Sequence, residues 1–327
     1  MLLQESLLVT LGKLVDGVPM PGPPPRGRGR PPVYPARLFL KALVIMMVRR
    51  LHQVTAFLAV LAEPTPERHA LRALLTAPQG RVPSRRTGER RLAAIPATLP
   101  AQIGCLGRHW VALLPPWADC ARAAAIDSTV LRALGGVWHK KNREAGVVPH
   151  TSIATEAHWT TSGWHGWVYG WKLPLVGPAA RVWLPLAAEF TPANAADNLQ
   201  APGLLQALPL ALRFLVGDQH YHAPALEPLC ARSGCRVITP TAGAYPHTDD
   251  GVEVRRILHK TRSIAIEHFN EQFKGIFEGH GQVPTRGLVA TRRFALGAIV
   301  VYQLALLHRH DIGADLRVGL KAFIRAA

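Results

Sequence analysis

Two aspartates stand at the ends of short apolar runs in a chain that has few acids. Asp127 follows a run at 123–126, and Asp218 follows a second run at 213–217. Runs of this length are typical of buried strands. Burying a carboxylate at the end of such a strand is costly unless a cation or hydrogen bonds compensate for it. Either aspartate alone also fits a turn or a helix cap, but the two together indicate a site for chemistry.

A third acid is indicated by the segment 262–277, whose spacing predicts an amphipathic helix. At about 100° per residue, the apolar side chains form one arc, while Glu267, Glu271 and Lys274 point together on another. A solvent-exposed face of charged residues is the ordinary explanation of such spacing. If the helix lies beside the two strand ends, the same face instead supplies a third carboxylate.

Three carboxylates on a sheet and a helix would suit Mg²⁺, for which Mn²⁺ would substitute. Mg²⁺ prefers oxygen ligands and commonly binds through a few carboxylates together with substrate phosphates. Two such ions, about 3.5 to 4 Å apart, activate a water or a 3′-hydroxyl and stabilise the leaving oxygen in phosphodiester displacement. Lys274 would hold a phosphate beside the metals. The acids therefore predict metal-dependent cleavage of a nucleic acid backbone.

The overall charge agrees with a polyanionic substrate. The 327 residues include 38 Lys and Arg against 21 Asp and Glu, for a formal net charge of +17. Hydrophobic residues make up 48% of the chain, which excludes a disordered basic tail or a low-complexity chain. No apolar run reaches the roughly 18 to 20 residues that a membrane span requires. The N-terminus lacks the basic region of a secretory signal, so we expect a cytoplasmic protein without a membrane partner.

The first third of the chain predicts an arm followed by a compact helical unit. Residues 17–32 are rich in Pro and Gly, and Arg26, Arg28 and Arg30 alternate with Gly there. Such a segment can follow a phosphate backbone or enter a minor groove, or it can be a solvated linker. From Tyr34 to about residue 115, apolar residues recur at helical spacing and basic residues outnumber acids. We expect a helical DNA-binding domain there.

After residue 117 the pattern changes to strands and then to alternating strands and helices. We expect a hairpin of strands at 167–175 and 182–190, and a last apolar helix at 294–307 that packs on the sheet. The other expected strands are 123–126, 213–217 and 236–239, and the other expected helices are 194–212, 223–232 and 262–277. This order describes an α/β fold with a mixed sheet covered on both faces.

Taken in order, the acidic segments resemble the DDE transposases of bacterial insertion sequences. The segment AIDSTVLRA at 125–133 resembles the strand of the first aspartate, and FLVGDQHYHAPAL at 214–226 the motif of the second. RSIAIEHFNEQFKGIF at 262–277 resembles the glutamate helix. The resemblance places the catalytic acids at Asp127, Asp218 and Glu267, with Lys274 at the lysine of E-x6-K. Glu271, which lacks this spacing, is the alternative third acid.

Further segments extend the resemblance across nearly the whole chain. GRPPVYPARLFLKALVIMMV (29–48) and VPSRRTGERRL (82–92) resemble the N-terminal part of these proteins, where a P-S-x-x-T-x-x-R element recurs. GWHGWVYGWKLPL (163–175) resembles the G-x-x-x-G-x-K strand, with Lys172 at the lysine. PLAAEFTPANAADNL (185–199) resembles the segment with a T-x-x-N-x-x-D element.

One signature of the family, Y-x2-R-x3-E-x6-K, is incomplete in this chain. Lys260 and Ser263 occupy the Tyr and Arg positions, and Arg262 lies one residue out of register. Only 48 residues separate Asp218 from Glu267, so the β-domain that some relatives insert there is absent.

The resemblance implies an RNase H-like catalytic domain at 119–327. It also implies an N-terminal helix and arm at 1–33 and a mainly α-helical DNA-binding domain at 34–118. The activity would be that of a transposase that binds terminal inverted repeats, cleaves the ends with Mg²⁺ and joins the 3′-hydroxyls to target DNA. Pairing of ends implies a homodimer on double-stranded DNA. The residues expected to contact DNA are Lys274, Lys172, Arg262, Arg26, Arg28, Arg30, Arg85, Arg86, Arg90 and Arg91.

Two other functions stay open at this point. One is a catalytically silent or domesticated DNA-binding protein of the same fold. The other is a structure-specific nuclease without strand transfer. Retention of all three acids argues against the first, and detection of joined products would distinguish the second.

Three other groups of residues have ordinary explanations that we prefer. A zinc cluster of His158, His165, His220 and His222 lacks any known ligand spacing. The tryptophans at 159, 164, 167 and 171 could stack bases, but alternating aromatics on a strand are more often core. The four cysteines, at 105, 120, 230 and 235, include one C-x4-C pair that matches neither a redox nor a zinc motif, so we expect buried, reduced thiols.

Overall fold

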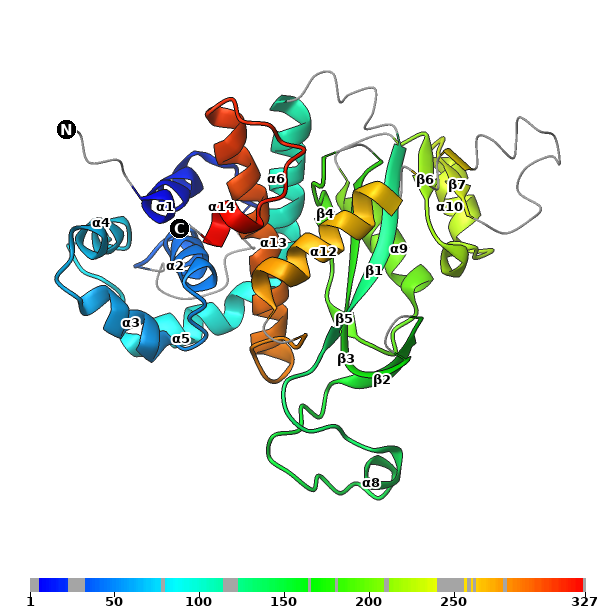
Figure 1. Ribbon diagram of the computed structural model, residues 1–327, viewed down its shortest axis with the longest axis horizontal. Coiled ribbons are helices and arrows are strands. Elements are labelled where there is room, and N and C mark those ends of the chain that lie inside the picture. Colours follow the sequence, from blue (N-terminus) through cyan, green and yellow to red (C-terminus); the bar gives the residue numbers. More distant parts are fainter. Residues whose placement is uncertain are drawn as a thin grey trace.

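A computed structural model of the chain shows a helical unit beside a twisted sheet (Figure 1). The structure describes residues 6–22, 33–77, 80–113, 123–163, 166–179, 182–208, 212–239, 256–257, 260, 263–278 and 281–325. The expected arm residues Arg26, Arg28 and Arg30 therefore lie outside the described residues, as does Arg262. The proposed domain boundaries at 33 and 118 stay predictions.

The sheet has the strand order β2-β3-β1-β6-β7. Its strands are β1 (Ala123–Arg132), β2 (His158–Ser162), β3 (Gly166–Pro178), β6 (Phe214–Val216) and β7 (Arg236–Ile238). Strand β3 is antiparallel to β1 and β2, whereas β6 and β7 run parallel to β1. The short strands β4 (Ala187–Ala188) and β5 (Thr191–Pro192) also pair with β3. The predicted mixed sheet is confirmed.

Helices cover both faces of this sheet. Alternate residues of β1 enter two different apolar clusters, because successive side chains of a strand point to opposite faces. Ala124 and Ile126 pack with α9 (Asp197–Ala207) and α10 (Leu226–Arg232). Ala125 belongs to the larger cluster, which also contains Ile266 at the start of α12 (His268–Phe277). Figure 1 shows α12 crossing in front of β1.

The strands around the predicted hairpin differ from the expectation in two ways. The segment 182–190 forms only the two-residue strand β4, because Pro185 has no N–H to donate to a ladder. The partner of the first half of β3 is instead β2, which pairs His158 with Gly170 and Ser162 with Gly166. The sequence HWTTS of β2 has no alternation of apolar and polar residues, so the sequence pattern does not predict this strand.

In the described residues before the sheet, a series of helices forms the helical unit. They are α1 (Leu7–Gly17), α2 (Ala36–Val48), α3 (Val54–Ala62), α4 (Pro66–Leu74), α5 (Arg85–Ala94), the 3₁₀ turn η1 (Ile95–Ala97) and α6 (Leu99–Leu113). Side chains of Ser6, Thr65 and Ser84 accept backbone N–H groups at the first turns of α1, α4 and α5. Such caps are worth about 1 kcal/mol each.

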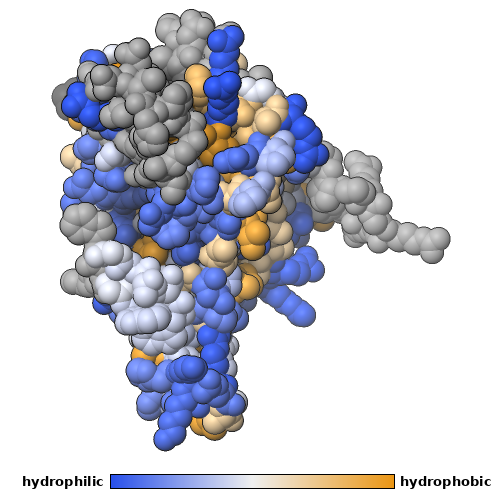
Figure 2. All heavy atoms as spheres, turned by 90° about the vertical axis from the view of Figure 1, so that its right-hand side faces the viewer, coloured by the Kyte–Doolittle hydropathy of each residue, from blue (hydrophilic) through white to orange (hydrophobic). Residues whose placement is uncertain are grey.

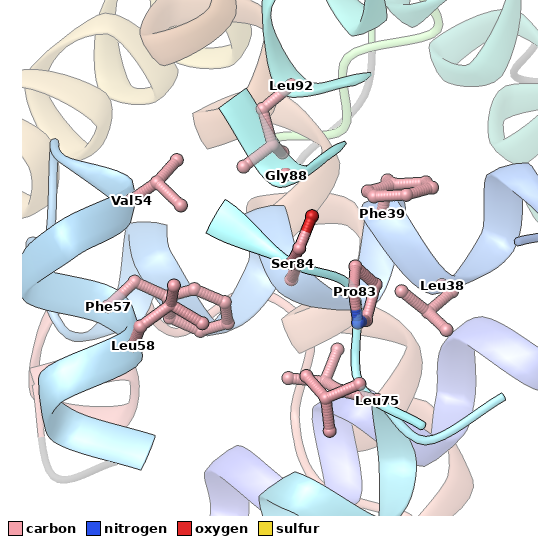
Figure 3. Close-up of a pocket in the computed structure, with 12 residues that line it drawn as sticks. Leu38, Phe39, Val54, Phe57, Leu58, Leu75, Pro83, Ser84, Gly88 and Leu92 are labelled. Carbon is pink, nitrogen blue, oxygen red and sulfur yellow. The ribbon is translucent and has the colours of Figure 1, made fainter. Parts of the chain in front are cut away.

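A small apolar cavity lies between α2, α3 and α5, lined by Phe39, Phe57 and Leu92 among others (Figure 3). Its volume is about 20 Å³ and its lining is almost entirely apolar, which does not suit an ordered water, because such a water needs two to four polar partners. It is a packing gap of the helical unit and lies on different elements from the acids.

The long C-terminal helix α13 (Leu288–Asp311) packs mainly on α6, α2 and α1 rather than on the sheet. The expectation that this helix would lie on the sheet was therefore wrong. Gln303, which is fully buried, donates to the carbonyls of Ile103 in α6 and Pro185 before β4. In the described part of the chain α13 alone has the length and composition to cross a membrane, and 72% of its apolar window is buried inside the protein. It serves as the core helix that joins the helical unit to the sheet.

A segment between β1 and β2 projects from the sheet and carries the short helix α8 (Lys140–Glu144) (Figure 1). On the face that Figure 2 shows, this projection is mainly hydrophilic. Its base is held by Arg143, whose guanidinium lies over the Trp138 ring and donates to the carbonyl of Ala157.

Candidate active site

The register of β1 and β6 brings the two aspartates together. Ala125 pairs with Val216, the last residue of β6, in this parallel ladder, so the register directs Asp127, two residues further along β1, toward the turn that carries Asp218. Neighbouring strands lie about 4.8 Å apart. Asp127 is in the middle of β1 rather than at its end as expected, because the strand continues to Arg132. The adjacency of the two acids comes from the parallel pairing of two short apolar strands.

The surroundings of both carboxylates are polar. Asp127 Oδ1 accepts the N–H of Ser128 at 2.8 Å, and Asp218 Oδ1 accepts the N–H of His220 at 2.9 Å. The His220 Nδ1 lies 3.0 Å from Asp218 Oδ2. By strand alternation Asp127 shares the face of Ala125, which the start of the glutamate helix covers. The carboxylate oxygens of the two aspartates are ligands that suit Mg²⁺ or Mn²⁺ better than a softer metal.

Tyr221 is buried beneath the two aspartates, with 1% of its surface exposed. Burial raises the pKa of its hydroxyl well above the ordinary value, and the charges of Asp197, Asp127 and Asp218 raise that pKa further, while the Ser128 hydroxyl lowers it. Within the described part of the chain, the buried hydroxyls of Tyr221 and Ser128 have no hydrogen bond of normal geometry. The two hydroxyls therefore interact with each other beside the acids in a geometry looser than that of a normal hydrogen bond.

The turn that presents Asp218 depends on a glycine. A Cβ at Gly217 would lie 2.8 to 2.9 Å from the ring and Cβ of Tyr221. Real Cβ atoms do not approach so closely, so either the Tyr221 ring or the turn would have to move.

Gly217→Ala is therefore expected to lower the free energy of unfolding by about 1 to 3 kcal/mol through overpacking. Urea unfolding followed by circular dichroism measures this change. Gly203→Ala in α9 is the matched control: no atom lies within 4 Å of its added Cβ, and alanine favours a helix, so this variant should gain up to about 1 kcal/mol. Equal stability of the two variants would contradict the packing argument.

Lys172 is part of an ion pair with Asp197 on the α9 side of the sheet. Its Nζ lies 2.8 Å from Asp197 Oδ2 and 3.1 Å from the carbonyl of Ala195. The two side chains are only 13% and 15% exposed. This contact joins β3 to the first turn of α9, where the carboxylate also favours the helix N-terminus. Lys172 was expected to hold a phosphate, and in this structure its ammonium group is occupied by the protein.

Lys172→Met is expected to lower the free energy of unfolding by about 3 kcal/mol, because it leaves the Asp197 carboxylate buried without its cation. The double variant Lys172→Met, Asp197→Leu should regain most of that loss. Arg292→Met breaks the half-exposed pair with Glu189, in which the N–O distance is 3.2 Å, and should cost below about 1 kcal/mol. Urea unfolding of the three variants measures these losses in the free energy of unfolding. An equal loss in the single Lys172 variant and the Arg292 variant would refute the prediction.

The glutamate helix begins with one π-helical turn, η3 (Ser263–Glu267), that packs on β1 and β3. Ile266 is buried against the sheet, 4.0 Å from the position that a Cβ at Gly177 would take. Glu267 is exposed at the junction with α12, and its Oε2 accepts the hydroxyl of Ser263. π-turns inside helices occur often at functional sites.

Glu267, the predicted third acid, thus lies on the element that covers Asp127. The sequence analysis made a role for this acid depend on such a position of the helix. Among the residues that the structure describes, no three His, Cys, Asp or Glu side chains lie close enough to hold a metal ion together. Glu271, the alternative acid, is exposed one turn further along α12. The choice between the two glutamates stays a prediction.

The far end of α12 is fastened by two arginines. Arg50 Nη2 donates to the carbonyl of Ile276 at 3.0 Å, and Arg325 Nη2 donates to that of Gly275 at 2.8 Å. Cations at a helix C-terminus satisfy the last carbonyls and the helix dipole. The position of the glutamate helix is therefore fixed by contacts from the helical unit and from α14 (Lys321–Arg325).

Glu278 follows α12 and faces Lys274, the residue expected to bind phosphate. Burial raises the pKa of this carboxyl above its usual 4.5, and the charges of Lys274 and Arg132 lower it by less. The folded state therefore binds this proton more tightly than the unfolded state. The stability that this group contributes is complete below about pH 4.5 and is lost as the pH rises through the folded pKa.

Glu278→Gln is accordingly expected to raise the free energy of unfolding at pH 7 and to change it little at pH 4. Urea unfolding at the two pH values measures the difference. Glu271→Gln, on the exposed side of α12, is the control and should not show this dependence on pH. A Glu278→Gln variant less stable than the wild type at pH 7 would show that the attraction of the Lys274 and Arg132 charges outweighs the cost of burial.

The arginines predicted to contact DNA on α5 fall into two groups. Arg86 and Arg90 are exposed, and Arg85 is exposed but paired with Glu89 at 2.7 Å. Arg91 instead donates to the carbonyl of Tyr34 and lies over the Phe39 ring, so it contributes to packing. Whether any of them binds DNA stays a prediction.

The histidines considered for zinc have other partners in the described residues. His158 lies 2.9 Å from Arg143 Nη2, and its pKa is lowered by burial and then by that charge. His222 Nδ1 lies 3.6 Å from Glu227. His165 is outside the described residues. Of the tryptophans, Trp171 is fully buried, whereas Trp167 is 70% exposed.

Three residues at the site were missed as functional candidates from the sequence. Tyr221, Ser128 and Asp197 surround the two aspartates, but only Asp197 was considered, as a helix-start residue. It does begin α9. These partners come from separate elements, so the sequence does not show that they lie together. The one local signal was a polar residue next to each predicted acid.

No protein-family model matches the chain, and no curated protein matches it. One similar solved structure is the piggyBac transposase synaptic complex with hairpin DNA, at 8% identity and a TM-score of 0.41. That match covers 98% of this chain and 76% of the other. A pre-cleavage Mos1 transpososome is similar at 12% identity and a TM-score of 0.23, covering 85% of this chain and 79% of the other. The Mos1 strand transfer complex matches at 13% identity, covers 88% and 81%, and has a TM-score of 0.24. Such low TM-scores do not establish a shared function.

Proposed function

We propose that this chain is a DDE transposase of the insertion-sequence type, with an RNase H-like catalytic domain. The observation that supports the proposal is the parallel pairing of β1, which bears Asp127, with β6, which leads directly into the turn of Asp218. The helix with Glu267 packs on the strand that bears Asp127, on the same face of the sheet. A sheet with one antiparallel edge and three parallel strands, in the order β2-β3-β1-β6-β7, supports the RNase H-like assignment.

In this proposal Asp127, Asp218 and Glu267 hold Mg²⁺, and Mn²⁺ substitutes for it. When bound, the metal lowers the pKa of a water or 3′-hydroxyl and stabilises the leaving oxygen of the phosphodiester. The protein groups divide the remaining work. The two aspartates concentrate negative charge at the middle of the sheet, and the Ser128 and His220 backbone N–H groups orient their Oδ1 atoms. Lys274 on α12 would hold a neighbouring phosphate.

The excess of basic residues supports DNA as the substrate, since the chain has 38 Lys and Arg but only 21 Asp and Glu. Neutralising phosphates releases counterions, so binding should weaken steeply with salt. Arg86 and Arg90 on the exposed side of α5 are the described candidates for backbone contacts. We propose that two copies of the chain pair the two ends of the element.

The test uses the full chain and a labelled duplex carrying the inverted repeats that flank its gene. With Mg²⁺ we expect strand cleavage at the repeat end and, with an unlabelled plasmid, joined products; with EDTA we expect binding alone. Nicks without joined products would replace this proposal with a structure-specific nuclease. Binding without cleavage at every Mg²⁺ or Mn²⁺ concentration would instead identify a silent DNA-binding protein of the same fold.

A further inference from the structure

Two buried cysteines meet where α10 ends, on the sheet face opposite α12. Cys235 N donates to the carbonyl of Cys230 at 2.9 Å, and Gly234 N donates to that of Ala231 at 3.0 Å. Gly234 has a φ of 70°, which glycine adopts without strain. These two bonds and the left-handed glycine are those of a Schellman motif, in which the side chains at the positions of Cys230 and Cys235 contact each other.

This turn holds the two thiols at a distance that a disulfide can bridge. Because the backbone bond joins the two residues directly, their Cα atoms lie no more than about 6.8 Å apart, within the disulfide range of about 4.4 to 6.8 Å. The Cys235 thiol donates weakly to the carbonyl of Arg236 at 3.8 Å. A bond between them therefore requires little movement of the backbone.

Both cysteines line a cavity between α9 and α10, whose other walls include Pro202, Leu205 and Leu229. Its volume is about 140 Å³, a few times the roughly 30 Å³ of one water. Cys230 and Cys235 are otherwise 2% and 5% exposed. The cavity thus gives a small molecule access to the two thiols.

The two thiols differ in their surroundings. The neighbouring Cys235 side chain lowers the pKa of the Cys230 thiol, although burial acts in the opposite direction. The neighbouring Cys230 side chain, followed by burial, raises the pKa of Cys235. Since the thiolate is the nucleophile, these directions favour Cys230 as the residue that attacks and Cys235 as the residue that resolves.

We propose that Cys230 and Cys235 form an oxidation site at which a small hydroperoxide produces an intramolecular disulfide. The Cys230 sulfur attacks one peroxide oxygen and breaks the O–O bond, giving a sulfenic acid and an alcohol or water. The Cys235 sulfur then displaces the sulfenic oxygen as water and forms the S–S bond. The two thiols lose two electrons, the peroxide gains them, and a dithiol reductant reverses the change. This site is independent of the proposed DNA chemistry.

Trypsin provides a direct readout, because Arg232 lies between the two cysteines. Cleavage after Arg213, Arg232 and Arg236 places Cys230 in the peptide 214–232 and Cys235 in the peptide 233–236. The folded full chain is treated with hydrogen peroxide, alkylated and digested. We expect one linked species, two hydrogens lighter than the separate peptides together, that splits on reduction.

Three variants sharpen the experiment. Cys235→Ser should stop at the sulfenic acid of Cys230, which dimedone traps, and Cys230→Ser should react with peroxide at least about tenfold more slowly at Cys235. Cys105→Ser, which changes another buried thiol, should still give the linked peptides. If a variant does not fold, the tryptic peptides of the oxidised wild-type protein test the proposal by themselves. The proposal fails if peroxide leaves both thiols open to alkylation, if Cys230 proceeds to sulfinic acid unlinked, or if the thiols react only in urea.

Discussion

Replacing Asp127 with asparagine is expected to slow Mg²⁺-dependent cleavage of repeat-end DNA by about 10³-fold or more. The amide has nearly the same shape but loses the negative charge at the middle of β1, the strand that pairs with β6 just before Asp218. A loss of 10³-fold corresponds to about 4 kcal/mol of transition-state stabilisation, within the several kcal/mol that one metal site supplies. Single-turnover cleavage of an end-labelled duplex measures the rate.

Binding provides the control for this variant. Asp127→Asn should retain affinity for the same duplex within a few-fold, because removing one negative charge does not weaken phosphate contacts. Unfolding in urea should show that the variant stays folded. Cleavage at the wild-type rate by a folded Asp127→Asn protein would remove the acid from the mechanism and the transposase proposal with it.

Replacing Glu267 with glutamine should slow the same reaction by about 10² to 10³-fold, whereas Glu271→Gln should change it by less than about threefold. The two glutamates are a matched pair, since both are exposed on one helix and lie one turn apart. Glu267 ends the π-turn that packs on β1, and its carboxylate accepts the Ser263 hydroxyl. Glu271 lies further along α12.

The reverse result would be equally informative. If Glu271→Gln is the inactive variant, the third acid has been assigned one turn too early, while Asp127 and Asp218 keep their roles. If both variants cleave at the wild-type rate, the helix supplies no ligand. A Mg²⁺ titration of each variant separates weaker metal binding, which raises the concentration needed, from a lower maximal rate.

The elements that carry the acids could be predicted because their signals are local. Strands β1 and β6 appear as short apolar runs, and the helix of Glu267 as an apolar arc with a charged arc beside it. The spacing of apolar residues does not show which elements pair with each other. The parallel pairing of β1 with β6, which brings the segments of Asp127 and Asp218 together, depends on the whole sheet.

Contacts between distant segments account for what the sequence did not predict. Lys172 lies on β3 and Asp197 on α9, and nothing in either segment identifies the other as its partner. The resemblance assigned a phosphate to Lys172, whereas the structure assigns it a carboxylate. Strand β2 was missed because its residues are polar and aromatic, so that only pairing with β3 makes it a strand. The apolar residues on all sides of α13 predicted its burial but not its neighbours.

The position of α13 also governs how the chain folds during synthesis. Helices α1, α2 and α6 pack on α13, which begins only at Leu288. After α6 is made, about 200 residues must follow before α13 is complete, which takes about 10 to 40 s at about 5 to 20 residues per second. Throughout that interval the apolar surfaces of the first helices have no covering helix. A nascent chain stopped before Leu288 is therefore expected to bind chaperones that recognise exposed apolar segments, and one stopped well after Asp311 to release them.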